Sequence, residues 1–132
     1  MKTLSKQDEK ALSQTLDHER LDVYQLALAF VRHVAPILKR LPAEFANDSD
    51  QLRRSAASVP RNIAEGSGRV GPADKSRYYA FAKGSATESG ATLDVLREFD
   101  CITIGEHMEG KTLIKRIVAM LVKLAQSVDE RR

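Results

Sequence analysis

Residues 51–69, with the sequence QLRRSAASVPRNIAEGSGR, constrain the fold more than any other stretch of this chain. At about 100° per residue, four of its apolar side chains fall on one stripe of a helix. They are Leu52, Ala56, Val59 and Ile63. Arg54, Arg61 and Glu65 fall on the opposite side. The spacing therefore predicts a helix that packs one face and presents charge on the other.

Pro60 lies inside this predicted helix. Because proline lacks the backbone N–H and crowds the preceding turn, the helix is expected to bend near Ser58 to Pro60, or to restart there. Gly66 and Gly68 supply the flexible exit that is typical of a helix C-terminus. We therefore expect the helix to end at Gly66.

The rest of the chain also predicts helices. Few glycines, prolines and aromatics, with abundant Ala, Leu, Arg, Lys and Glu, favour helix over sheet. Besides the helix that ends at Gly66, the apolar periodicity predicts three more: 21–40, with a kink at Pro36; about 73–100; and a last one from a capping box at Thr103–Glu106 to about Val128. Ala43 to Asp50 reads as a polar connection whose last residues cap the second long helix.

The length of 132 residues fits one domain. We expect a polar N-terminal segment at 1–19, either a short helix that begins at the Ser5–Asp8 capping box or a disordered stretch, and a four-helix domain at 20–132. Cys101 is the single cysteine, and no segment has the length of apolar sequence that spans a bilayer. The expected protein is soluble and cytoplasmic, without a membrane partner.

Two of the predicted helices carry more apolar surface than one core contact requires. In 21–40, Tyr24, Leu28 and Val31 belong to one stripe, and Phe30 and Val34 belong to a second. The last helix is apolar over about half of its circumference. Either each helix is flanked on two sides within its own bundle, or the second stripe meets another copy of the chain. The same excess on both helices favours a homo-oligomer.

The positive charge is concentrated in one segment. The chain has a net charge of +3, but residues 51–84 alone sum to +5. An anionic partner that binds this segment, RNA or DNA, is one interpretation, and a solvated or salt-bridged face is the other. The candidate binding residues are Arg53, Arg54, Arg61, Arg69, Lys75, Arg77 and Lys83.

The helix predicted at 73–100 has a stripe rich in small residues, including Ala82, Ser85 and Ser89. Such a stripe predicts a close helix crossing. Glu88 is expected either to be partly buried beside an arginine of the preceding helix or to reach water at the boundary. Of the two adjacent tyrosines, we expect Tyr78 in the core and Tyr79 to be the one available for stacking on unpaired bases.

No catalytic constellation is found in the sequence. His18, His33 and His107 are far apart, and none has the Glu-x-x-His spacing of carboxylate-bridged metal bundles. Gly66-Ser67-Gly68 lacks the Lys-Ser/Thr of a phosphate-binding loop. Nothing near Cys101 suggests a nucleophile. We expect neither a metal, nor a cofactor, nor an enzyme.

Three stretches carry a family resemblance. They are Leu21-Asp22-Val23-Tyr24-Gln25, the segment 51–69, and Ala82-Lys83-Gly84-Ser85 followed by Glu88. Over about 21–128 the chain resembles the helical proteins encoded within intervening sequences of bacterial 23S ribosomal RNA genes. The matching motif positions are Asn62, Glu65, Gly66, Gly84, Ser85 and Glu88.

The resemblance implies an all-α, antiparallel up-down four-helix bundle that assembles as a pentameric ring. A related branch, the accessory proteins of diversity-generating retroelements, implies a basic oligomer that binds nucleic acid and a partner protein. We therefore expect a non-enzymatic, oligomeric nucleic-acid-binding or ribonucleoprotein-accessory protein. The alternative is a scaffold that recognises an unidentified protein.

Overall fold

The computed structural model describes residues 3–13 and 16–129. This part of the chain is helical throughout, without strands, as expected. Five α-helices form: α1 (Lys6–Ser13), α2 (Asp22–Arg40), α3 (Ala46–Gly68), α4 (Pro72–Glu98) and α5 (Ile104–Asp129). Two short 3-10 helices, η1 (Asp17–Arg20) and η2 (Ala43–Phe45), precede α2 and α3. The four long helices α2 to α5 correspond to the four that were expected, and α1 is an additional short helix.

Helix α1 lies in the segment for which a short helix or disorder was expected. Its first turn has the predicted capping box, because the Asp8 N–H donates to Ser5 Oγ at 3.1 Å and the Ser5 N–H donates to Asp8 Oδ2 at 3.3 Å. Residues 1–2 and 14–15 of the predicted segment, and residues 130–132 of the predicted domain, lie outside the described residues. The division at residue 20 remains a prediction.

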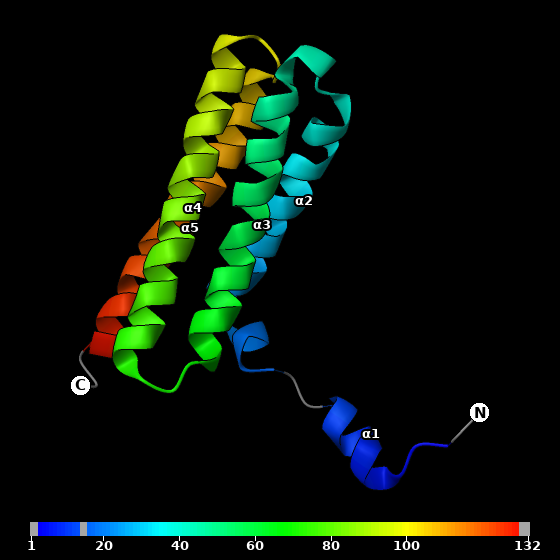
Figure 1. Ribbon diagram of the computed structural model, residues 1–132, viewed down its shortest axis with the longest axis vertical. Helices are drawn as coiled ribbons and strands as arrows, with labels where there is room; N and C mark the ends of the chain where they lie inside the picture. Colours follow the sequence, from blue (N-terminus) through cyan, green and yellow to red (C-terminus); the bar gives the residue numbers. More distant parts are fainter. Residues whose placement is uncertain (1–2, 14–15, 130–132) are drawn as a thin grey trace.

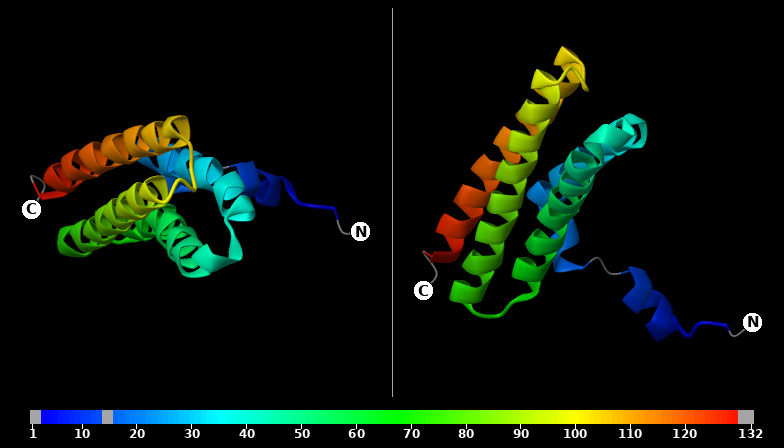
Figure 2. Two further views of the ribbon diagram at one scale, coloured as in Figure 1. Left: turned by 90° about the horizontal axis from the view of Figure 1, so that it is seen from above. Right: turned by 45° about the horizontal axis from the view of Figure 1, so that its top comes forward.

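The long helices α2 to α5 pack side by side, and successive helices run in opposite directions (Figure 1). Each contacts its neighbours in sequence, and α2 also contacts α5. In the described ranges no close backbone approach joins α2 to α4, or α3 to α5. The bundle therefore has two layers, α2 with α5 and α3 with α4, seen along the bundle in Figure 2. We call the lines along which neighbouring helices meet seams. The α2–α3 seam and the α4–α5 seam therefore lie on opposite sides of the bundle.

The core occupies the space between the two layers. The predicted stripe of α3 is confirmed, since Leu52, Val59 and Ile63 have no exposed surface and Ala56 has almost none. Each fully buried large apolar side chain contributes about 1.5–3 kcal/mol relative to exposure. The largest buried side chains from the other helices include Phe30, Ile37, Leu93, Leu96, Ile117 and Leu121.

Helix α3 begins earlier than predicted. The expected polar connection at 43–50 instead forms η2 and the first turn of α3, and Phe45 closes η2 by donating its N–H to the Pro42 carbonyl at 2.9 Å. Phe45 occupies the N-cap position without a side-chain cap, so the predicted caps lie inside the helix. Asp48 in the first turn favours the helix through its interaction with the helix dipole.

Pro60 does not interrupt α3. The helix continues from Ala46 to Gly68, so the predicted restart is wrong, and the end lies two residues beyond the predicted Gly66. Pro60 is buried. Two residues further on, the Asn62 side-chain amide donates to the Ser58 carbonyl at 2.9 Å and to Ser58 Oγ at 2.8 Å. These bonds add local side-chain support to the turn that contains the proline.

The α3–α4 crossing is close, as the small residues of α4 predicted. Two hydroxyl pairs join the helices: Ser55 with Ser89, whose oxygens are 2.7 Å apart, and Ser58 with Ser85, at 2.8 Å. Ser55 and Ser89 are buried, and each hydroxyl satisfies the other. The serine pairs hold α3 in a fixed rotation against α4.

A hydropathy search of the described helices finds none that is long and apolar enough to cross a membrane.

Replacing Gly66 or Gly84 by alanine should change the free energy of unfolding in opposite directions. A Cβ added at Gly66 would lie 2.7 Å from Cε1 of buried Tyr79, whereas one at Gly84 meets nothing within 4 Å. Gly66→Ala should therefore destabilise the fold by about 1–3 kcal/mol through overpacking. Gly84→Ala should stabilise it by about 0.5–1 kcal/mol, because alanine is the better helix former.

Urea denaturation of both variants beside the unchanged protein measures these free energies of unfolding. Equal shifts in the two variants would contradict the assigned packing of Gly66 against Tyr79.

Candidate nucleic-acid interface

The exposed face of α3 holds three of the predicted cations. Arg53, Arg54 and Arg61 are all exposed, and the side chain of Arg54 retains 76% of its accessible surface. Arg53 and Arg54 share one carboxylate, Asp50, with Arg54 Nε 3.0 Å from Asp50 Oδ2. Two guanidinium groups on one carboxylate leave a net positive charge at this point. Exposed ion pairs of this kind hold their side chains weakly.

Arg61 lies two turns beyond Arg54 on the same face of α3. It forms no salt bridge within the described part of the chain. Its side chain lines a hollow of about 320 Å³ in the α2–α3 seam. The other lining residues are apolar or aromatic: Tyr24, Leu28, Val31, Ala57, Pro60 and Ala64. Arg61 is therefore a cation at the edge of an apolar groove.

A second group of cations lies at the α3–α4 connection. Arg69 and Arg77 both lie over the Tyr78 ring, with guanidinium carbons 4.7 and 5.1 Å from its centre. Arg69 also donates to the Tyr78 hydroxyl at 2.9 Å. Both arginines pair with Asp74, and Arg69 pairs with Glu65 at 2.6 Å. The hydrogen bond to Glu65 raises the pKa of Arg69 above its usual value.

Lys75 has a structural role at this connection. Its ammonium group donates to the carbonyl of Ser67 at 2.8 Å and to that of Gly66 at 3.3 Å. These are carbonyls of the last turn of α3, and that of Gly66 also accepts the backbone N–H of the C-cap residue Arg69 at 3.2 Å. Lys75 thus caps a helix end, and its charge is directed inward rather than toward a ligand.

Lys83 lies apart from the arginines. It is exposed and lines a hollow of about 270 Å³ in the α4–α5 seam, with Ala80 and Val122 among its neighbours. The structure therefore divides the predicted set into three places: the α3 face, the α3–α4 connection and the α4–α5 seam. The +5 of residues 51–84 does not form one continuous patch.

The expected roles of the two tyrosines are wrong. Tyr79 is 4% exposed and packs in the core, where it fills the space left by Gly66. Tyr78 is half-buried between the two arginines. In helix α4, which begins at Pro72, Tyr79 rather than the preceding Tyr78 is on the side that faces the core. An aromatic ring beside the α3 face is supplied instead by half-buried Tyr24 of α2.

The motif residues of the family resemblance have separate structural roles. Asn62 supports the turn at Pro60, Glu65 pairs with Arg69, and Gly66 makes room for Tyr79. Ser85 bonds Ser58 across the α3–α4 seam, whereas Gly84 is exposed. Of the two alternatives for Glu88, the exposed one is correct. Of these positions, Gly66 and Ser85 secure the α3–α4 pair, whereas Gly84 and Glu88 face solvent.

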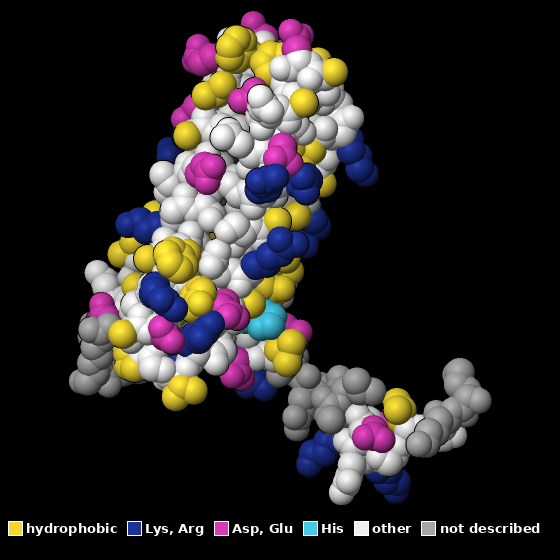
Figure 3. Space-filling view, viewed as in Figure 1, with side chains coloured by type: hydrophobic (Ala, Val, Ile, Leu, Met, Phe, Trp, Pro, Cys, Tyr) yellow, Lys and Arg dark blue, Asp and Glu magenta, His cyan; other side chains and the backbone are white. Residues whose placement is uncertain are grey.

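Sequence reasoning missed cations on α2. Arg32 and Lys39 are exposed and lie seven residues apart, on one face of the helix that borders the α2–α3 seam. In Figure 3 dark blue side chains follow α3 down the middle of the molecule and continue along the edge formed by α2. The signal was present in the sequence, but the charge of residues 21–50 sums to −1 and conceals it.

Helix α5 has a further basic stretch that the charge sums concealed. Residues 110–128 contain Lys111, Lys115, Arg116 and Lys123 and no Asp or Glu. Lys111 pairs with Asp94 at 2.9 Å, and His107 contacts the same carboxylate at 2.7 Å. Although desolvation opposes it, these hydrogen bonds lower the pKa of Asp94.

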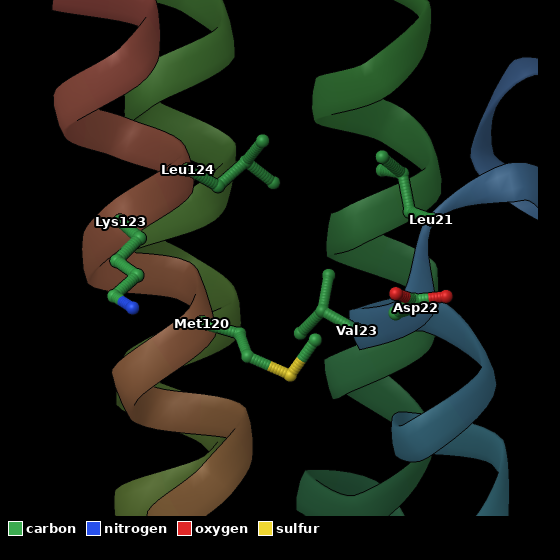
Figure 4. Close-up of a pocket in the computed structure, with 6 residues that line it drawn as sticks. All are labelled: Leu21, Asp22, Val23, Met120, Lys123 and Leu124. Carbon is green, nitrogen blue, oxygen red and sulfur yellow. The ribbon is translucent and has the colours of Figure 1, made fainter.

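Another hollow and the cysteine lie outside the groups of predicted cations. A hollow of about 330 Å³ between the start of α2 and α5 is lined by apolar side chains, with Asp22 and Lys123 on opposite sides of it (Figure 4). Burial, with the nearby carboxylates Glu44, Asp48 and Asp100, raises the pKa of Cys101 and disfavours its thiolate. No group of three potential metal ligands occurs among the described residues.

Comparison with known proteins is consistent with the bundle and its central motif. A model of the 23S rRNA-intervening sequence protein family matches residues 19–123. A crystal structure of a protein of unknown function from the S23 ribosomal protein family of Bacteroides thetaiotaomicron has a TM-score of 0.70 and 22% identity. The match covers 78% of this chain and 97% of that chain, and it shows a shared fold. Among curated proteins there is no match. With most of its length matched, the chain belongs to the 23S rRNA-intervening sequence protein family.

Proposed function

We propose that the chain is a non-enzymatic, oligomeric protein that binds the phosphates of a nucleic acid, as an accessory of a ribonucleoprotein. One observation carries the proposal: Arg53, Arg54 and Arg61 are exposed on one face of α3, and among the described residues Asp50 is the one carboxylate that pairs with any of them. Guanidinium groups bind phosphate oxygens in bidentate geometry.

The mode of binding follows from the groups that the face offers. Arginine contacts to phosphates fix position without reading sequence, so weak sequence selectivity and a steep salt dependence are expected. The α2–α3 groove beside this face, which contains Tyr24, is assigned below to the contact with another subunit, so binding rests on the arginines.

A non-enzymatic role is supported by the use of the reactive groups. His33 contacts the Glu106 carbonyl at 2.8 Å, His107 contacts Asp94, and the rings of His18 and Tyr24 pack edge to face. The Cys101 thiol is disfavoured as a thiolate. The contacts of His18 and His33 serve the fold. His107 and Asp94 line a hollow of about 270 Å³, where Lys111 also pairs with the Asp94 carboxylate.

We also propose that the bundle of α2 to α5 assembles with further copies of itself. Half-buried apolar side chains of α2, such as Leu28 and Val31, line the α2–α3 seam, and Val118 and Val122 of α5 line the α4–α5 seam. These seams lie on opposite sides of the bundle. Two different apolar faces favour head-to-tail contacts, which close into a ring when the rotation permits. The family resemblance implies five subunits.

The basic face is tested by Arg54→Glu combined with Arg61→Glu. Loss of two phosphate contacts and the added negative charge should abolish binding of a short labelled single-stranded RNA at about 150 mM salt. At lower salt, the slope of log affinity against log salt should fall in magnitude by about 1.4, which is two contacts at about 0.7 each on a single strand. Fluorescence anisotropy measures both quantities.

The matched control is Arg116→Glu with Lys123→Glu. These exposed cations of α5 are also seven residues apart, so the change in net charge and spacing is the same. The control should retain most of the affinity. Equal loss in both double variants would reduce the effect to net charge, and unchanged affinity in the α3 variant would remove this face from binding.

The head-to-tail contact is tested by charging one face at a time. Leu28→Glu should disable the α2–α3 face and Val122→Glu the α4–α5 face, so each variant alone should be monomeric. A mixture of the two retains one intact pair of faces, and should give a dimer of about 29 kDa, twice the 14.7 kDa chain. Light scattering behind size exclusion measures these masses.

Two results would contradict this assembly. A mixture that stays monomeric, although each variant alone is folded by circular dichroism, would show that these faces do not meet. A single variant that keeps the full oligomer would place the subunit contact elsewhere.

A scaffold that recognises another protein is the second candidate. Its supporting observation is that Asp50 already pairs with Arg53 and Arg54 of the proposed face. At the α3–α4 connection, Glu65 pairs with Arg69 and Asp74 pairs with Arg77. Purified protein that carries no nucleic acid, judged by the ratio of absorbance at 260 and 280 nm with a nuclease control, would favour the scaffold. The chain has no Trp and only three Tyr, so this ratio is sensitive to small amounts of nucleic acid.

A further inference from the structure

Exposed apolar side chains gather at the end of the bundle where α4 turns into α5. Phe99 and Met108 each expose 63% of their surface, Ile104 exposes 59%, and Val95 exposes 42%. Val95 and Phe99 are four residues apart on α4 and its C-cap, and Ile104 and Met108 are four residues apart in the first turns of α5. Each pair therefore forms a short apolar ridge on its helix. We call these four residues the apolar end.

The core does not need these side chains. Phe99 touches the bundle through the edge of Phe45, with ring centres 5.4 Å apart, and most of its surface stays in water. Ile102, in the same turn, is 3% exposed and fills the core position. A single exposed apolar residue is ordinary, whereas several around one turn indicate an interaction surface.

The charge around the apolar end is predominantly negative. The nearby cations are Arg97 and Arg40, which pair with Asp100 and Glu106, and Lys111 and Lys115, which line a hollow with Met108. Residues 41–50 contain Glu44, Asp48 and Asp50, and residues 98–109 contain four further acids, with no Lys or Arg in either segment. Those four are Glu98, Asp100, Glu106 and Glu109. In Figure 3 magenta and yellow side chains lie together at the upper end of the bundle, where no dark blue is seen in this view.

Part of this charge is not neutralised by the fold. Asp50, Asp100 and Glu106 pair with arginines, and Glu109 lies 3.6 Å from His33. Glu44, Asp48 and Glu98 make no salt bridge among the described residues. Burial is the largest effect that raises the pKa of the Cys101 thiol. The negative charges of Glu44, Asp48 and Asp100 raise it further, so these acids lie near Cys101 in the turn.

We infer that the apolar end docks a basic amphipathic helix of another protein. The two apolar ridges fit the apolar stripe of a helix, and the surrounding carboxylates fit lysines or arginines on its flanks. The same carboxylates repel phosphates, so this end favours a protein over a nucleic acid. The inference does not rest on the proposed binding of nucleic acid, which uses the middle of α3.

The test uses a labelled synthetic peptide of about 18 residues, with leucines on one helical face and lysines on the other. The full chain should bind it by fluorescence anisotropy. Two control peptides should bind at least tenfold more weakly: a scrambled sequence of the same composition, which has no apolar face, and a version with glutamate in place of lysine.

Protein variants locate the site. Ile104→Lys with Met108→Lys should weaken binding of the leucine–lysine peptide at least tenfold. Leu16→Lys with Val70→Lys makes the same charge change at two side chains that are 60% and 96% exposed elsewhere, and should leave binding unchanged. Glu44→Gln with Glu98→Gln should weaken binding and reduce its salt dependence.

Several results would overturn the inference. One is equal binding of all three peptides to the unchanged protein. Another is equal binding of the leucine–lysine peptide to the Ile104/Met108 and Leu16/Val70 variants. The last is loss of single-stranded RNA binding in the Ile104/Met108 variant. The last would place nucleic acid at this end. Retained peptide binding in the Arg54/Arg61 double variant would show that the two surfaces act separately, so either proposal can fail without the other.

Discussion

The close α3–α4 crossing is the contact on which the rest of the structure depends. Serine hydroxyls meet across it at two successive levels, Ser55 with Ser89 and Ser58 with Ser85. Side chains this small let the backbones approach, and the paired hydroxyls fix the rotation of α3. That rotation buries Leu52, Ala56, Val59 and Ile63 and leaves the arginines in water. The packing of the helix pair and the presentation of charge are thus set by the same contact.

Much of this could be predicted from periodicity. The buried stripe of α3, the start of α2 and the capping box at Thr103 and Glu106, whose bonds measure 2.8 and 3.0 Å, all follow from local spacing. The orientation of adjacent residues was harder to predict, because neighbouring side chains of a helix point about 100° apart. An error of one position exchanged the predicted roles of Tyr78 and Tyr79. A charge sum contains no direction, so it could not show that Lys75 donates to carbonyls of α3 or that Lys83 lies at the α4–α5 seam. Charge sums over long segments also concealed the cations of α2 and α5, because nearby acids cancel them in the sum.

The charges form a pattern along the bundle that no segment sum reveals. Cations occupy the exposed faces of α3 and α2 in the middle of the molecule, and acids surround the apolar end where the α2–α3 connection and the α4–α5 turn meet. Most individual pairs are exposed and weak, so they orient side chains more than they stabilise the fold. A molecule of this kind offers one surface to polyanions and another to basic proteins. In a ring, each surface would be repeated once per subunit.

The central claim is that an assembled basic face holds nucleic acid through electrostatic contacts. The most direct test is light scattering behind size exclusion on the unmodified protein, at low and high salt, with absorbance recorded at 260 and 280 nm. The account predicts a discrete oligomer near five times 14.7 kDa that persists at high salt while its bound nucleic acid is released. A monomer at both salt concentrations, free of nucleic acid throughout, would contradict it.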